Sequence, residues 1–182
     1  MALREILKYP DPALRDPAQP VRDIDARVAA VMQDLAETMY AAPGVGLAAT
    51  QVGIPERIIV LDVHGPDEAP GRRLMKLINP EIAEREGELV WEEGCLSVPD
   101  LTAPVKRARR VLVRAWTTGE KEIQVEADEL LAVALQHEID HLDGTLFLDH
   151  LSRLKRDFYR ARQRKLERQG RKSAGASRPL LI

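Results

Sequence analysis

The chain has 182 residues, of which 45% are hydrophobic and 31% are charged, and its formal net charge is −2. This length suffices for one domain with a sizeable core and is short for two. No stretch is apolar enough to span a membrane, and the first residues lack the apolar region of a signal peptide. The single cysteine excludes an intramolecular disulfide. We therefore expect one cytoplasmic globular domain over residues 1–168.

The charge is unevenly distributed along the chain. From Arg153 onward, Lys and Arg greatly outnumber Asp and Glu, so the remainder is acidic. We expect a basic C-terminal helix over residues 151–168 and a disordered basic tail over residues 169–182. This asymmetry predicts an anionic partner for the basic segment.

The N-terminal part combines an irregular stretch with one helix and two strands. Several prolines in the first two dozen residues disfavour regular structure there. Apolar residues at helical spacing predict a helix over residues 25–41. Aliphatic and β-branched residues predict a strand over residues 57–63, and a second strand is expected over residues 74–79.

The second half is predicted to be β structure followed by a buried helix. Residues 80–125 have mostly β character, with a hairpin whose strands are residues 111–116 and 122–126. Asp128 is the expected N-cap of the helix, and Gly144 is expected just past its end. Apolar residues cover most of the circumference of this helix, which is typical of a buried one.

The predicted central helix carries the most informative motif, His137-Glu138-Ile139-Asp140-His141, which has the form H-E-x-x-H. Residues i and i+4 share a helix face, so His137 and His141 can bind one metal ion. Glu138 stands beside them, where it can accept a proton from a metal-bound water. Unpaired polar groups in a core are costly, so a metal explains the motif better than two unrelated core histidines. The motif predicts hydrolysis.

The third protein ligand of such a site is left open by the residues alone. The metzincin pattern fails because Phe147 occupies the position of its third histidine. Cys95 is one candidate: a lone cysteine is by default a small buried hydrophobe, but its Gly and Ser neighbours favour an exposed turn. A thiolate would suit Fe(II) or Zn(II). The other candidates are Asp149, Glu167, His64 and His150.

Two other classes of function are compatible with the motif. A zinc peptidase of another kind would need a downstream third ligand and rarely uses a cysteine. A structural metal site would need four protein ligands, and only three converge. The basic C-terminal segment also suggests a non-enzymatic function, that of a ribosome-associated binding module.

Three stretches together resemble the peptide deformylase family, in its bacterial type I branch. They are Gly44-Val-Gly-Leu-Ala-Ala-Thr-Gln51, Glu93-Gly-Cys-Leu-Ser97 and His137-Glu-Ile-Asp-His141, and the opening Ile6-Leu-Lys-Tyr-Pro-Asp-Pro-Ala-Leu-Arg15 is also similar. The likeness extends over residues 4–151. With the predicted elements it implies an α+β fold, in which antiparallel sheets pack around a buried central helix carrying H-E-x-x-H, with an N-terminal and a C-terminal helix.

The resemblance implies a metal-dependent hydrolase that removes the N-formyl group from the N-terminal formyl-methionine of new polypeptides and releases formate. It implies that Cys95, His137 and His141 bind one divalent metal ion. The resemblance further implies that this ion is Fe2+ in the cell, and that Zn2+ or Ni2+ can replace it in the purified protein.

The resemblance also implies the catalytic roles. Glu138 acts as general acid and base while metal-bound water attacks the formyl carbon. Gln51 and the backbone N–H of Leu96 stabilise the oxyanion that forms. Our candidates for substrate binding are Val45, Gly46, Gly94, Val133 and Ala134. Ordinary core packing would explain Val133 and Ala134 equally well.

One departure from the family concerns the substrate chain. Many relatives carry an arginine shortly after the second motif that helps to hold the peptide, and Asp100-Leu101-Thr102 occupies this stretch here. The expected partners are N-formylmethionyl nascent peptides and, through the basic helix, the ribosome. Neither a membrane nor DNA is expected as a partner.

Overall fold

The computed structural model of the protein describes residues 2–64 and 69–170. The helices are α1 (Ala26–Ala41), α2 (Glu129–Leu142) and α3 (Arg153–Gly170), with short 3-10 turns η1 (Pro12–Arg15), η2 (Ala49–Val52) and η3 (Phe147–His150). The strands are β1 (Gly46–Ala48), β2 (Ile58–Leu61), β3 (Met75–Glu86), β4 (Leu89–Cys95), β5 (Val98–Arg107), β6 (Arg110–Trp116) and β7 (Glu122–Asp128).

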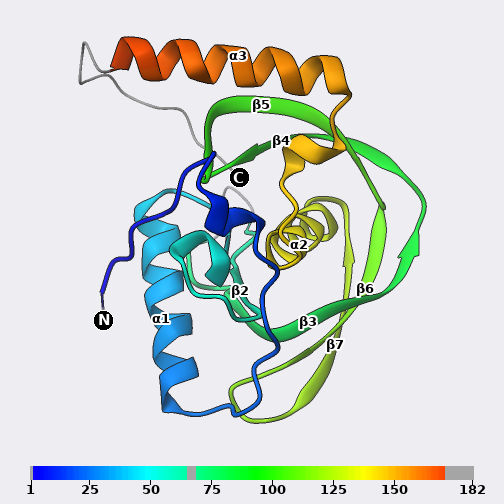
Figure 1. The fold of residues 1–182 in the computed structure, drawn as a ribbon. Helices are drawn as coiled ribbons and strands as arrows, with labels where there is room; N and C mark the ends of the chain where they lie inside the picture. Colours follow the sequence, from blue (N-terminus) through cyan, green and yellow to red (C-terminus); the bar gives the residue numbers. More distant parts are fainter. Residues whose placement is uncertain (1, 65–68, 171–182) are drawn as a thin grey trace.

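All of these strands pair in antiparallel fashion, in two sheets. The larger sheet has the order β1-β2-β3-β6-β7, and β4 and β5 form a separate pair. The central helix α2 lies between α1 on one side and β3, β6 and β7 on the other (Figure 1). This arrangement confirms the predicted α+β fold with antiparallel sheets around a buried helix.

Strand β2 explains how two helices pack on one sheet. Successive side chains of a strand point to opposite faces. Ile59 and Leu61 join the core cluster that contains Leu135 of α2, whereas Ile58 and Val60 join the cluster of α1. All four β2 side chains are fully buried. The predicted continuous apolar run is thus a strand covered on both faces.

The ends of α2 are set as the sequence predicts. Asp128 is the N-cap residue and also the last residue of β7, and its side chain makes no capping hydrogen bond. Gly144, at φ 70°, follows the C-cap Asp143 in the left-handed conformation that glycine adopts without strain. Helix α1 likewise begins after Asp25, whose side chain accepts a hydrogen bond from Val28 N at 3.0 Å.

Two elements differ from their predicted extent. Strand β3 continues through Pro80, past the predicted end of the strand at residue 79, because the pairing with β6 shifts register between Ile78 and Glu81. A proline is tolerated in a strand at such an irregularity. Helix α3 begins at Arg153 and lies along β5 (Figure 1). Among the α3 side chains that the structure describes, Tyr159 is buried against the core, whereas Leu154 and Phe158 are exposed.

Within the described ranges, no helix is both long and apolar enough to cross a bilayer. The tail predicted to be disordered lies, from residue 171 onward, outside the described residues.

Candidate metal centre

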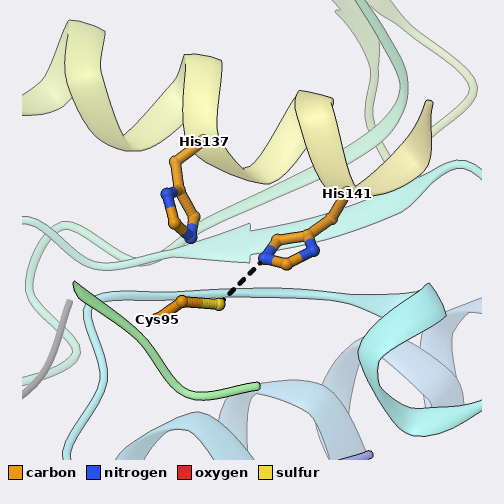
Figure 2. A group of neighbouring side chains, drawn as sticks. All are labelled: Cys95, His137 and His141. Carbon is orange, nitrogen blue, oxygen red and sulfur yellow. Dashed lines mark hydrogen bonds between the residues drawn. The ribbon is translucent and has the colours of Figure 1, made fainter. Parts of the chain in front are cut away.

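The side chains of Cys95, His137 and His141 converge in the interior of the protein. One potential ligand atom from each lies within 4.8 Å of the others, and this is the one such group among the described residues. Both imidazoles project from the same side of α2 toward Cys95 (Figure 2), whose Sγ is 3.2 Å from His141 Nε2. All three residues are at most 2% exposed. Of the candidates for the third ligand, the structure therefore brings Cys95 to the histidines.

Cys95 reaches this position because it is the last residue of β4. The chain turns at Leu96 and Ser97 and returns in β5, which begins at Val98. Ser97 N donates to Cys95 Sγ at 3.4 Å, which fixes the sulfur inside the turn. The expectation of an exposed turn was wrong, because Cys95 is completely buried.

The other candidate ligands have different partners. Asp149 binds Arg15 and accepts a hydrogen bond from Leu146 N. His150 Nε2 lies 2.7 Å from Asp140 Oδ2. His64 is not in the group, and the side chain of Glu167 is outside the described part.

The donor set fits a divalent metal ion with an open coordination position. One thiolate and two imidazoles leave the fourth tetrahedral position free, as in catalytic rather than closed structural sites. Two buried atoms at the centre, Glu138 Oε2 and His141 Nδ1, have no hydrogen-bond partner among the described residues. Buried polar atoms without partners are rare, and a bound ion or water is one explanation for them.

The electrostatics of the cluster favour the thiolate form that binds metals. Burial by itself raises the pKa of Cys95, but His141 and His137 more than offset this and lower the pKa to about 5. Burial likewise lowers the pKa of His137, yet its hydrogen bonds with Cys95 and Glu93 raise it well above the usual value. A metal cation would take the place of these shared protons, since its ligands must be deprotonated.

Glu138 stands next to this cluster and is buried with it. It is 2% exposed, and burial raises the pKa of its carboxyl group to about 7. Its carboxylate lies directly against the backbone of Gly46, where an added Cβ would overlap it. Gly46 therefore makes the room that Glu138 occupies.

Gln51 points its amide nitrogen at the same sulfur. Its Oε1 accepts a hydrogen bond from Ala48 N at 2.8 Å, which orients the side chain. Its Nε2 then lies 3.1 Å from Ser97 Oγ and 3.7 Å from Cys95 Sγ. The small residues before Gln51 form β1 and η2, which bring this amide and Gly46 to one place.

A buried ion pair behind the cluster was not predicted from the sequence. Glu93, which is fully buried, receives two hydrogen bonds from Arg107 at 2.7 and 3.0 Å and lies 2.9 Å from His137 Nδ1. This contact leaves His137 Nε2 to face the sulfur, as in the carboxylate–histidine–metal arrangement. The sequence feature that could have revealed the buried Arg107 is the alternation of β5, in which Ala103, Val105 and Arg107 share the inward face.

The candidates for substrate binding lie close to this centre in the chain, but nothing in the structure tests their role. Gly46 and Gly94 are buried and Val45 is half-buried. Val133 and Ala134 are both completely buried, and Ala134 belongs to the core cluster between α2 and the larger sheet. Thr102, in the stretch where the family resemblance led us to expect an arginine, is exposed on β5.

Comparison with known proteins gives one consistent result. The sequence profile of the family described as polypeptide deformylase matches residues 3–157. The peptide deformylases of Syntrophobacter fumaroxidans and Alkalilimnicola ehrlichii are each 49% identical, over 165 residues (91% of this chain, 96% of the relative) and 175 residues (96% and 97%). The crystal structure of a peptide deformylase from Legionella pneumophila superposes with a TM-score of 0.85 and 42% identity, covering 95% of this chain and 100% of that one.

Proposed function

The chain belongs to the polypeptide deformylase family, whose enzymes remove the N-formyl group from polypeptides, and from this premise we propose which metal it uses and how its residues act. The observation that carries the proposal is the convergence of Cys95, His137 and His141 beside Glu138, whose buried Oε2 has no hydrogen-bond partner among the described residues. A centre with three protein ligands and an adjacent base is suited to hydrolysis of a formyl amide.

The three ligands would hold one divalent metal ion. We expect Fe2+ in the cell, with Zn2+ or Ni2+ replacing it in purified protein, because a thiolate beside two imidazoles suits these softer metals. When bound, the ion supplies a Lewis acid that activates water and polarises the formyl carbonyl. Glu93 and Arg107 hold the ring of His137 in the orientation that ligation needs.

Glu138 serves as the general acid and base of the reaction. It takes the proton of the attacking water and passes it to the departing amine nitrogen of methionine. The raised pKa of about 7 places its two protonation states within reach near neutral pH. No hydrogen bond from the described part of the chain restrains Glu138 Oε2, so this oxygen is available to the water.

Two donors stabilise the negative charge that develops on the formyl oxygen. Gln51 Nε2 lies beside Cys95 and is held there by the contact of its own oxygen with Ala48 N. The backbone N–H of Leu96 is the second donor. Preorganised neutral donors of this kind stabilise an oxyanion without a cost of reorientation during the reaction. Val45, Gly46, Gly94, Val133 and Ala134 are proposed to contact the formyl-methionine.

The test is formate release from a formyl-Met peptide and from its acetyl-Met analogue, with protein loaded anaerobically with Fe(II). We expect release from the formyl peptide alone, and loss of activity after removal of the metal with a chelator. Glu138→Gln should keep the metal and lower kcat by about 10²- to 10⁴-fold, since it removes the proton acceptor. Cleavage of internal amide bonds, or full activity of Glu138→Gln, would reject this assignment.

We further propose that α3 docks the enzyme on the ribosome in the cytoplasm, where the enzyme acts on nascent chains. This helix exposes Lys155 and Arg162 on one face, two turns apart, and its apolar residues Leu154 and Phe158 are 82% and 73% exposed. A basic surface of this kind is complementary to ribosomal RNA.

Charge reversal on α3 tests the docking. The double variant Lys155→Glu/Arg162→Glu should lose co-sedimentation with ribosomes at low salt and keep its activity on free peptides. Unchanged co-sedimentation would show that α3 is a solvated charged helix instead.

A further inference from the structure

We propose that Lys8 is a positioning residue for the metal-binding thiolate, and that its ammonium group acts on Cys95 through the Leu96–Ser97 peptide group. This inference rests on the proposed role of Cys95 as a metal ligand. Lys8 lies in the irregular N-terminal segment, distant from Cys95 in sequence, and its Nζ donates to the carbonyl oxygen of Leu96 at 2.5 Å.

The backbone on both sides of Lys8 is fixed to the candidate site. Leu7 N donates to the carbonyl of Gln51 at 2.8 Å, and Tyr9 N donates to the carbonyl of Ser97 at 2.8 Å. Lys8 is thus held between two hydrogen bonds that end on residues flanking the sulfur. Its long side chain consequently reaches one particular carbonyl, although the residue itself is exposed.

The peptide group that Lys8 contacts is bonded to the thiolate at its other end. Its carbonyl oxygen belongs to Leu96, which is 5% exposed, and its N–H belongs to Ser97, which is fully buried. Ser97 N donates to Cys95 Sγ at 3.4 Å. The ammonium, the peptide group and the sulfur therefore form one continuous chain of hydrogen bonds.

Such a chain transmits the effect of the charge. A cation on a carbonyl oxygen polarises the peptide group and strengthens the hydrogen bond that its N–H donates, because successive hydrogen bonds polarise one another. A stronger N–H···S bond draws electron density from the thiolate. Residues behind a metal ligand tune the metal in this way, without touching it or the substrate. Lys8 also holds the Leu96–Ser97 peptide group in the orientation that places its N–H on the sulfur.

The test compares Lys8→Met, which removes the charge and keeps the length, with Lys8→Arg, which keeps the charge. Lys121→Met is the matched control, since Lys121 is an exposed lysine in the β6–β7 turn. The proteins are loaded with Co(II), and the sulfur-to-cobalt charge-transfer absorption is recorded beside kcat and KM for a formyl-Met peptide. An electron-richer thiolate moves this band to longer wavelength.

We expect Lys8→Met to shift the band to longer wavelength. It should also lower kcat about three- to tenfold with KM unchanged, which is a smaller loss than is typical for a residue in direct contact with a metal ligand. Lys8→Arg should restore both, and Lys121→Met should change neither. A band at the wild-type position in Lys8→Met would overturn the proposal, whatever the activity. A wild-type protein without any sulfur-to-cobalt band would instead overturn the assignment of Cys95 as a ligand.

Discussion

Glu138 lies against the backbone of β1 because the residue opposite its carboxylate is Gly46. The side chain is buried and its Oε2 has no hydrogen-bond partner among the described residues, so close packing against Gly46 contributes to its position. A general base is useful only within hydrogen-bond reach of the proton that it accepts. A single methyl group on the opposite backbone is therefore expected to affect the reaction as well as the packing.

We predict that Gly46→Ala lowers kcat/KM about 100-fold or more, since a misplacement of about 1 Å at a reacting group has an effect of this size. The added Cβ would overlap the carboxylate and displace it. Formate release measures the loss, and metal content and circular dichroism establish that the site and the fold persist. Gly119→Ala is the control, because its Cβ would meet its nearest neighbour at 3.8 Å, an ordinary contact. Wild-type activity of Gly46→Ala would show that Glu138 tolerates displacement.

At the scale of single residues, the sequence predicted which residues form the candidate site better than it predicted which residues position them. His137, Glu138 and His141 share one short motif whose geometry is that of a helix, so local spacing was sufficient to place them together. The contacts of Gly46 with Glu138 and of Glu93 with His137 join residues from different strands and a helix. Such contacts depend on how the elements pack against one another, and the spacing of residues along the chain does not predict this packing.

At the scale of the elements, β4 and β5 are joined to α2 by ion pairs and not by apolar packing alone. Arg107 of β5 is 6% exposed and bonds both Glu93 of β4 and Asp140 of α2, at distances down to 2.5 Å. Gln136 of α2 adds hydrogen bonds to both backbone groups of Ala108. The small sheet is thus fixed to the helix that carries the two histidines, and this positions Cys95 against them.

We predict that Arg107→Met destabilises the protein by about 3–5 kcal/mol, because it leaves the buried carboxylate of Glu93 without its compensating charge. Urea unfolding at constant metal content measures the free energy of unfolding. The double variant Glu93→Gln/Arg107→Met removes both charges and should lose less stability than Arg107→Met alone. If the double variant were the less stable of the two, an uncompensated charge would not be the cause.

The sequence predicted those elements whose signals are local. The apolar spacing of α1, the ends of α2 at Asp128 and Gly144, and the hairpin of β6 and β7 are confirmed by the structure. The full length of β3 was missed because residues 74–79 were predicted as a strand of their own. The register shift beside Pro80 lets the pairing with β6 resume, so the strand continues. The exposure of Leu154 and Phe158 on α3 was also not predictable, since helical spacing does not say which face meets the core.

For the molecule as a whole, the irregular N-terminal segment acts as a strap across the domain. Ala18 N donates to the carbonyl of Leu142 at the end of α2, and Leu7 N reaches Gln51. Arg15 forms an ion pair with Asp149 in η3. These contacts join the start of the chain to the turn after the central helix, so this segment is part of the domain although it contains little regular structure.

The link between Arg15 and Asp149 predicts a dependence of stability on pH. Burial by itself raises the pKa of Asp149, but the hydrogen bonds from Arg15 and Leu146 N prevail and lower it. A carboxyl group whose pKa is lower in the folded state stabilises that state above its unfolded pKa of about 3.9. This stabilisation is lost as the pH falls through the lowered folded-state value.

Asp149→Asn should therefore be less stable than the wild type by about 1 kcal/mol near neutral pH, and the difference should shrink as the pH falls below about 4. Urea unfolding of the metal-free proteins between about pH 3 and pH 7 measures it without the pH dependence of metal binding. Asp23→Asn, at an exposed position before α1, is the control for the loss of one negative charge. A difference for Asp149→Asn that stayed constant over this range would mean that the ionised form of Asp149 does not contribute, and that the strap is held by its backbone hydrogen bonds.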